Sequence, residues 1–192
     1  MAESGHTARH TARCWLYSCT MLPLLRAFFQ IILRQLGPED LPDSRLLLVL
    51  SLGLYVLAQI LPALQVYGST PTAALAIVID VLLLVSAVWA VLRLAGHPSR
   101  YRQTVSALLG TGALLTVPLV PLQFWLQMFT QAGHAPAGPS LAILLLMTWS
   151  LTVQGHILSR ALSAPFVIGL LVAVGYFIVN YAVIWQLAPA GS

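Results

Sequence analysis

The sequence predicts an all-α, polytopic membrane protein: a compact bundle of five transmembrane helices preceded by an amphipathic interfacial helix. Of its 192 residues, 59% are hydrophobic and only 7% are charged, and the mean hydropathy is +0.88. A typical soluble domain is about 25% charged, so charge this scarce cannot cover a 20.7 kDa globule in water. The apolar residues gather in five long runs, and all nine arginines fall on one side of the topology that these runs define.

Residues 1–20 differ in composition from the rest of the chain. They are polar, hold two histidines and two arginines, and show no clear periodicity. They also lack the apolar core and the small-residue cleavage site of a signal peptide. We therefore expect a disordered or mis-called N-terminal extension, with the structured protein beginning at Met21. Cys14 and Cys19 lack the further Cys or His pair that a zinc site requires.

Residues 21–45 are expected to form an interfacial amphipathic helix followed by an acidic, proline-rich turn. Arg26, Gln30 and Arg34 are four residues apart and form one polar stripe on a helix. The opposite face is apolar and holds Phe28, Phe29, Ile32 and Leu36. Such a helix lies in the membrane interface. The alternative, a sixth span, would bury Arg26 near the bilayer centre at a cost of about 2.5–3.5 kcal/mol.

The turn contains an acidic cluster of Glu39, Asp40 and Asp43, which holds three of the five acidic residues in the chain. Two prolines make this turn rigid, and Asp43 or Ser44 can cap the first spanning helix. A turn-and-cap role and a partner-docking site both remain open for this cluster.

The five spans are expected near residues 46–66, 72–95, 104–128, 141–159 and 165–187. Each is close to the 20 or so helical residues that a hydrocarbon core requires. Glycine and proline punctuate the connections near residues 67–71, 96–99, 131–139 and 163–165. Connections this short make successive spans antiparallel neighbours, so residues 46–187 form one transmembrane domain.

The arginines predict the orientation of the bundle. Five precede the first span, three lie at the second connection and one lies at the fourth. The first and third connections and the C-terminal tail have none. By the positive-inside rule the arginine side is cytosolic, which places the N-terminus in the cytoplasm and the C-terminus in the periplasm. The exclusive use of arginine, with abundant Ala and Leu, is typical of a GC-rich bacterial genome. No basic face is formed, so nucleic acid is not an expected partner.

Asp80 is the ionisable side chain deepest within a span. It lies about eight residues, or roughly 12 Å, from the outer end of its helix. Gln59, Thr116, Thr148 and Asn180 lie at similar depth on the other four spans, so we expect one intramembrane polar layer in the outer half of the membrane. Intramembrane acids face the bundle interior and mark either function or a buried partner. The layer is either a hydrogen-bonded clamp with an uncharged carboxyl or a polar, ion-sensitive site.

No motif for catalysis, metal binding or a phosphate group is found, so we expect no enzyme activity, no cofactor and no metal. Small residues in the second, third and fifth spans allow close helix packing or a face for a homo-oligomer. They include Gly110, Gly112, Gly169, Gly175 and Ala90.

The lead-in segment ending in Pro38-Glu39-Asp40-Leu41-Pro42, and the span that begins with Tyr101–Ala113, resemble the Yip (Ypt-interacting protein) domain superfamily. The resemblance covers roughly residues 21–187 and is closest to uncharacterised proteobacterial inner-membrane proteins. It implies five closely spaced helices and a cytosolic N-terminus. The eukaryotic members carry an Asp-Leu-Tyr-Gly-Pro segment that Asp40-Leu41-Pro42 only echoes. Binding of Rab-type GTPases is therefore not carried over.

Two functions are expected. The first is a non-enzymatic inner-membrane protein that acts through helix–helix contacts or contacts with a membrane partner. Its partners would be the lipid bilayer and another copy or another membrane protein. The alternative is a small transporter or channel subunit that uses the polar layer around Asp80.

Overall fold

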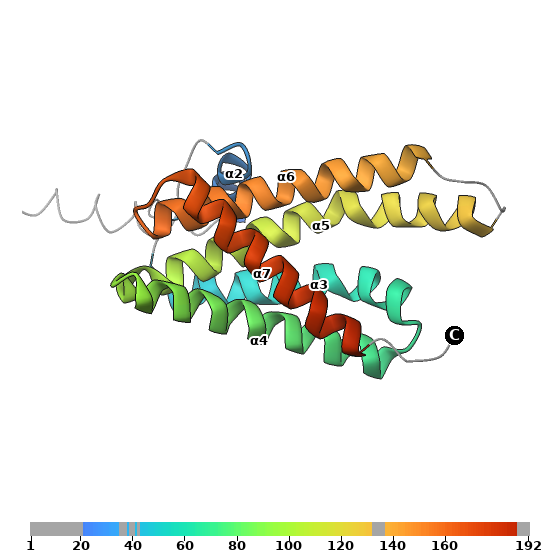
Figure 1. The fold of residues 1–192 in the computed structure, drawn as a ribbon, viewed down its shortest axis with the longest axis horizontal. Helices are drawn as coiled ribbons and strands as arrows, with labels where there is room; N and C mark the ends of the chain where they lie inside the picture. Colours follow the sequence, from blue (N-terminus) through green and yellow to red (C-terminus); the bar gives the residue numbers. More distant parts are fainter. Residues whose placement is uncertain (1–20, 35–37, 39–40, 42, 132–136, 188–192) are drawn as a thin grey trace, which may run out of the picture.

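The computed structural model of this chain describes residues 21–34, 38, 41, 43–131 and 137–187. Within these residues every regular element is a helix (Figure 1). The helices are α2 (Met21–Ile32), α3 (Arg45–Tyr67), α4 (Thr70–Leu94), the short 3₁₀ helix η2 (Pro98–Arg100), α5 (Tyr101–Gln131), α6 (Ala137–Ala161) and α7 (Phe166–Leu187). The expectation for residues 1–20 lies outside the described residues.

Five of these helices, α3 to α7, are long and apolar enough to cross a membrane. The predicted all-α architecture with five membrane-spanning helices is therefore confirmed. The third span is longer than expected, because α5 runs from Tyr101 to Gln131 with Pro118 and Pro121 inside it. By contrast, α2 has 12 residues, or about 18 Å at 1.5 Å per residue. That length is short of a hydrocarbon core of about 30 Å, and among the described residues α2 is not one of the helices long enough to cross a membrane.

The apolar face of α2 packs against the bundle. Phe28, Ile31 and Ile32 are buried, whereas Arg26 is exposed. A Cβ atom at Gly110 of α5 would collide with the Phe28 ring, so glycine at this position lets the ring lie directly on the α5 backbone. Phe29 was expected on the same apolar face, but it is 59% exposed. It is one residue beyond the buried stripe and points away from α5.

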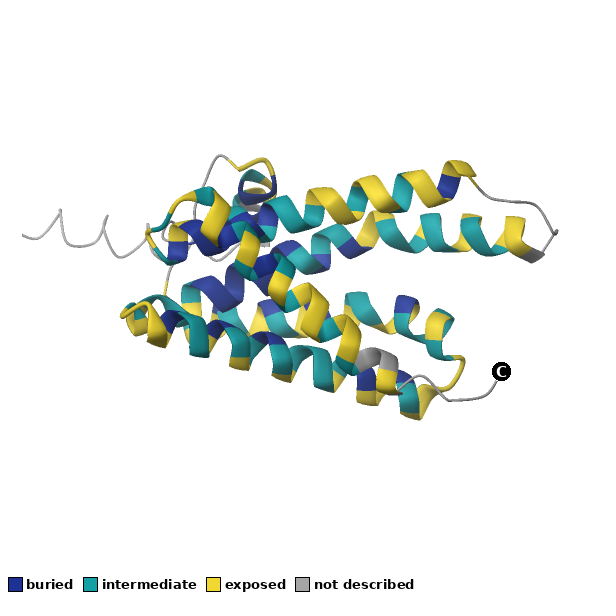
Figure 2. Ribbon diagram, in the orientation of Figure 1, coloured by how far each residue is buried: buried dark blue, intermediate teal, exposed yellow. Residues whose placement is uncertain are grey.

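Helix α5 is the central element of the bundle. It packs closely on α3 and α6, and it also contacts α2 and α4. All residues from Thr104 to Thr111 are buried, because neighbouring helices surround this part of α5. Helix α7 packs on α6 and then crosses the bundle toward the beginning of α4 (Figure 1). Most buried residues gather toward the end of the bundle where α2 lies (Figure 2).

We call the α2 end the arginine end, because the described arginines lie in or just after α2, at the start of α3, at the end of α4 and α6, or in η2 and the start of α5. Arg100 donates to the carbonyl oxygens of Arg160 and Ala161 at 3.2 and 3.3 Å, so its guanidinium caps the C-terminus of α6. The Arg93 guanidinium lies over the Trp89 ring, 5.0 Å from its centroid. These contacts hold the arginine side chains at one end of the bundle.

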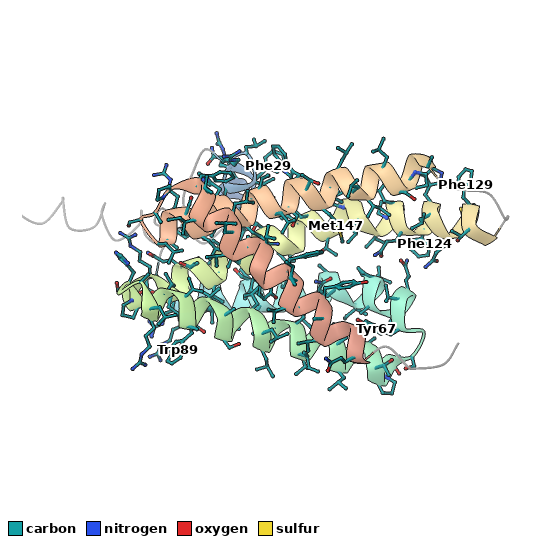
Figure 3. The ribbon with its side chains drawn as sticks, viewed as in Figure 1. Phe29, Tyr67, Trp89, Phe124, Phe129 and Met147 are labelled. Atoms are coloured by element: carbon teal, nitrogen blue, oxygen red, sulfur yellow. The ribbon has the colours of Figure 1, made fainter. Side chains whose placement is uncertain are left out.

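Large aromatic side chains lie exposed toward both ends. Trp89 is near the arginine end of α4, and Phe124 and Phe129 are on the distal half of α5 (Figure 3). Aromatic belts at both interfaces are typical of membrane proteins. Their placement agrees with a bundle whose axis runs across a bilayer.

The crossing of α6 and α7 generates the first prediction. A Cβ atom at Gly169 would collide with the backbone of Gly155 and Ser159, whereas one at Gly175 would meet nothing within 4 Å. We expect Gly169→Ala to lower the free energy of unfolding by about 1–3 kcal/mol, as overpacking does. Gly175→Ala is the matched control on the same helix, and alanine's helix propensity favours it by up to about 1 kcal/mol. Unfolding in mixed detergent micelles measures both. Equal effects of the two substitutions would contradict the close crossing.

Candidate functional site

The Asp80 carboxyl lies ten residues, or about 15 Å, from the beginning of α4. The Tyr55 hydroxyl of α3 donates to Oδ2 at 2.6 Å. On the other side, the Tyr176 hydroxyl of α7 donates to Oδ1 at 3.2 Å, and the Asn180 amide donates to the same oxygen. Both carboxyl oxygens therefore accept hydrogen bonds from neighbouring helices. We call Tyr55, Gln59, Asp80, Tyr176 and Asn180 the Asp80 cluster.

The cluster has two similar arms. On α3 the Gln59 amide donates to the Tyr55 hydroxyl at 2.9 Å. On α7 the Asn180 amide donates to the Tyr176 hydroxyl at 3.0 Å. In each arm the amide lies four residues after the tyrosine, the spacing that places two side chains on one helix face. Each tyrosine thus accepts from an amide and donates to Asp80, which gives both arms a direction toward the carboxyl.

The donors that reach Asp80 within the described part of the chain are hydroxyl and amide groups, and none is a cation. An ionised carboxyl is purely an acceptor, with two oxygens that take about four hydrogen bonds. Neutral dipoles from α3 and α7 therefore provide the described hydrogen bonds to the carboxyl group.

A polar pocket adjoins the α3 arm. It lies between α3, α5 and α6 and has a volume of about 140 Å³. At roughly 30 Å³ for each water, this volume holds a few water molecules. Its polar wall consists of Tyr55, Gln59, Thr116, Ser150 and Gln154, and leucines and Met147 make up most of the remainder. We call it the Gln59 pocket. The hydrogen-bond chain from Asp80 through Tyr55 to Gln59 ends at this pocket.

Gln154 is half-buried inside the bundle. It lines the Gln59 pocket and also a second cavity of about 30 Å³ among α4, α5, α6 and α7. The Gln154 amide donates to the Ser150 hydroxyl at 3.3 Å. The next residue, Gly155, lies where α6 and α7 approach closely, which places Gln154 beside the core of the bundle.

The structure brings together three of the five residues of the expected polar layer: Asp80, Asn180 and Gln59. Thr116 is buried and lines the pocket, but its hydroxyl donates to the Gly112 carbonyl of its own helix at 2.9 Å. Thr148 is exposed and donates to the Leu144 carbonyl at 2.8 Å. Equal depth sets the level of a residue along the bundle but not the face on which it lies. A threonine hydroxyl can also donate its hydrogen bond to a backbone carbonyl of its own helix, and it then needs no partner on another helix.

Sequence reasoning missed the two tyrosines. Tyrosine was counted among the apolar residues of the spans, and its hydroxyl was not considered as a donor. The available signal was the repeated spacing of a tyrosine and an amide four residues later, in Tyr55–Gln59 and again in Tyr176–Asn180. Asp80 of α4 lies at a similar depth and completes the pattern.

The acidic cluster is only partly described. Glu39 and Asp40 lie outside the described residues. Asp43 is about half exposed, and its carboxylate is 3.8 Å from the Arg102 guanidinium, a surface pairing that contributes little to stability. Ser44 occupies the N-cap of α3 but makes no capping hydrogen bond with its side chain. Among the residues that the structure describes, no group of three or more His, Cys, Asp or Glu could hold a metal ion.

No protein-family model, curated protein or solved structure matches the chain. Function is therefore inferred from the Asp80 cluster and the pocket beside it.

The asymmetry of the two arms generates the second prediction. The hydrogen bond from Tyr55 is the shorter one, and Tyr55 is also the more buried tyrosine. Hydrogen bonds between membrane helices contribute about 0.6 kcal/mol on average and up to about 1.7. We expect Tyr55→Phe to lower the free energy of unfolding by an amount near that upper value, and Tyr176→Phe by less.

Thr148→Val is the matched control, because it removes a hydroxyl that bonds only to its own helix. Unfolding in mixed micelles measures all three variants. If Tyr55→Phe costs no more than Thr148→Val, the Asp80 cluster does not hold α3 to α4.

Proposed function

We propose that this chain is a non-enzymatic, multi-pass protein of the bacterial inner membrane that handles a small polar solute or ion. It would act as a small transporter or channel subunit, with the Gln59 pocket as the binding site and Asp80 as the charge behind it. This is the second of the two functions expected from the sequence. The geometry of the pocket now favours it over a role through contacts alone.

The observation that carries the proposal is the hydrogen-bond chain from Asp80 through Tyr55 to Gln59, which ends at a polar pocket. A clamp that only holds helices together needs paired polar groups but no cavity beside them. Ionisable residues within membrane spans characteristically face a water-filled cavity or pair inside the bundle. Asp80 pairs inside the bundle, and one of its donors, Tyr55, is also part of the pocket wall.

The proposed route enters from the end opposite the arginine end. There the α5–α6 pair diverges from the α3–α4 pair (Figure 1). The pocket is built where these pairs separate, with Gln59 on one side and Met147 and Ser150 on the other. With the arginine end in the cytoplasm, by the positive-inside rule, the pocket opens toward the periplasm. The N-terminus is then cytoplasmic and the C-terminus periplasmic.

Membership of the Yip domain superfamily belongs to the same proposal. Its support is the set of five closely packed spans preceded by an amphipathic helix that packs on the third span. A partner-docking role for Glu39, Asp40 and Asp43 would lie on the cytoplasmic side in this topology.

A second candidate function, contact with another membrane helix, is favoured by a groove between α4 and α7. The groove has a volume of about 510 Å³ and is almost entirely apolar. Ser86, Ala87, Ala90 and Gly175 make part of its wall small. Small residues let membrane helices approach closely, so this face suits a helix of a second copy or of another protein.

Cysteine labelling tests the proposed pocket and its direction. In a chain with Cys14 and Cys19 replaced by serine, Ser150→Cys should react with a membrane-impermeant thiol reagent added outside intact cells. We expect this labelling because the proposed pocket holds water that is continuous with the periplasm. Leu145→Cys is the lipid-facing control on the same helix, and it should stay unlabelled because its side chain is 63% exposed on the apolar surface.

Two further positions report the topology. Thr70→Cys, at the beginning of α4, should react from outside, whereas Ser163→Cys, between α6 and α7, should react only after the membrane is opened. If Ser150→Cys is as inert as Leu145→Cys, there is no water-filled pocket and the proposed function is wrong.

Cross-linking tests the second candidate. We expect Gly175→Cys in native membranes to give a bis-maleimide adduct if a second helix occupies the groove. Leu75→Cys, exposed on α4 outside the groove, is the control. Ala90→Leu should abolish the adduct by filling the groove. An adduct of twice the mass of the chain identifies a second copy, and adducts at Leu75→Cys alone would contradict a role for the groove.

A further inference from the structure

The apolar groove between α4 and α7 is a wedge that widens toward the arginine end. At its inner end the Tyr176 hydroxyl and the Asn180 amide of α7 donate to the Asp80 carboxyl of α4, so the two helices are joined there. From this point α7 diverges from α4 and packs on α6 (Figure 1). A Cβ atom at Gly175 would meet nothing within 4 Å, so no described side chain fills the space beside it. We call this space the α4–α7 groove.

The α4–α7 groove is about as deep as one leaflet of a bilayer. Its wall on α4 begins at Leu83, and Arg93 lies in the last turn of the same helix. The two residues are ten positions apart, or about 15 Å at 1.5 Å per residue, which is half of a hydrocarbon core of about 30 Å. A spanning helix contacts its partner over most of the full thickness, whereas an acyl chain occupies one leaflet. The depth of the groove therefore favours an acyl chain over the helix considered above.

A basic cavity lies beside the groove at the arginine end. It has a volume of about 590 Å³, and Trp89 lines both this cavity and the groove. Arg93 and Arg102 give the cavity its positive charge, and Ser99 and Tyr101 add hydroxyl groups. We call it the Arg93 cavity. An apolar channel and a basic cavity thus share one aromatic wall.

The two arginines differ in how much charge they leave for a ligand. The Arg102 guanidinium is 3.8 Å from the Asp43 carboxylate, which offsets part of its charge. Among the described residues Arg93 makes no ion pair, and its guanidinium lies over the Trp89 ring, 5.0 Å from the centroid. A guanidinium that stacks on a ring keeps N–H donors along its edge, and this edge matches the oxygens of a phosphate group. Arg93 therefore offers an anion-binding edge at the wide end of the groove.

We propose that the α4–α7 groove and the Arg93 cavity together bind one anionic phospholipid. One acyl chain lies in the groove, and the phosphate group accepts hydrogen bonds from Arg93. Basic pockets between spans at a membrane surface recognise the headgroups of anionic lipids. Trp89, near the arginine end of α4 (Figure 3), occupies the level at which tryptophan gathers at the interface. This site is separate from the Gln59 pocket, so either proposal can fail without the other.

Headgroup charge is tested by native mass spectrometry of the full-length protein in detergent micelles. Phosphatidylglycerol and phosphatidylcholine with identical acyl chains are titrated in turn. We expect one phosphatidylglycerol per chain to bind about fivefold more tightly, the effect of about 1 kcal/mol for one arginine near an anionic surface. The choline cation of phosphatidylcholine is repelled by the arginines. Equal affinities for the two lipids would overturn the proposal, and so would displacement of the lipid by glycerol 3-phosphate, which has no acyl chain.

Three variants locate the headgroup. Arg93→Gln should weaken phosphatidylglycerol binding about fivefold and phosphatidylcholine binding by less. Arg26→Gln is the matched control, because it removes the same charge from an exposed position on α2, which packs on α5 and α6. Asp43→Asn should strengthen phosphatidylglycerol binding, because it releases Arg102 from its ion pair, and a gain in affinity cannot come from misfolding. Equal weakening by Arg26→Gln and Arg93→Gln, or no gain with Asp43→Asn, would contradict a headgroup in the Arg93 cavity.

The acyl chain is tested separately. Ala90→Leu places a larger side chain in the groove and should weaken the binding of both lipids. Ala74→Leu is the control, since Ala74 is exposed on the same helix outside the groove. If the two substitutions act alike, no acyl chain lies in the groove. A cross-linked protein adduct at Gly175→Cys in native membranes would place a helix there and also overturn the proposal.

Discussion

The structure depends on one requirement: a carboxyl group within a membrane span must find its hydrogen-bond partners inside the protein. Lipid provides none, and an unpaired polar group in hydrocarbon costs several kcal/mol. Asp80 meets the requirement with Tyr55 on one side and with Tyr176 and Asn180 on the other. These partners come from α3 and α7, which do not pack closely on each other. The carboxyl of α4 therefore links α3 and α7 by hydrogen bonds, while α4 itself packs on both.

The bundle packs tightly at one end and loosely at the other. The Asp80 cluster and the Gln59 pocket lie between these two parts. At the arginine end, α5 is surrounded on all sides, α2 lies on Gly110, and α6 and α7 touch through Gly155 and Gly169. Toward the opposite end the helix pairs diverge (Figure 1), and most side chains are exposed (Figure 2). A rigid half thus supports the Asp80 cluster while the open half leaves room for the Gln59 pocket. Functional groups held by a rigid scaffold beside an accessible space are typical of binding sites.

Part of the site could be predicted from depth alone. Asp80 was identified because an acid within a long apolar run has few explanations, and Gln59 and Asn180 because amides at that depth need partners. Depth could not exclude Thr148, since the face of a helix that turns inward depends on its neighbours. For the same reason, depth could not predict that Gln154 of α6 lies beside the Gln59 pocket. The tyrosines were missed because tyrosine is counted as an apolar residue in a hydrophobic span. Its hydroxyl nevertheless needs a hydrogen-bond partner when it is buried.

By itself, the sequence determined that the chain is all-α, that it has five helices able to cross a membrane and that its arginines gather at one end. These follow from residue chemistry counted along the chain: hydrocarbon thickness sets helix length, and glycine and proline mark the connections. Only the tertiary structure decided that α7 crosses to α4, that α2 packs on α5 and that a pocket opens beside Gln59. Those features depend on which helix faces meet. Faces are selected by collective packing of side chains from distant segments, which no local pattern of residues records.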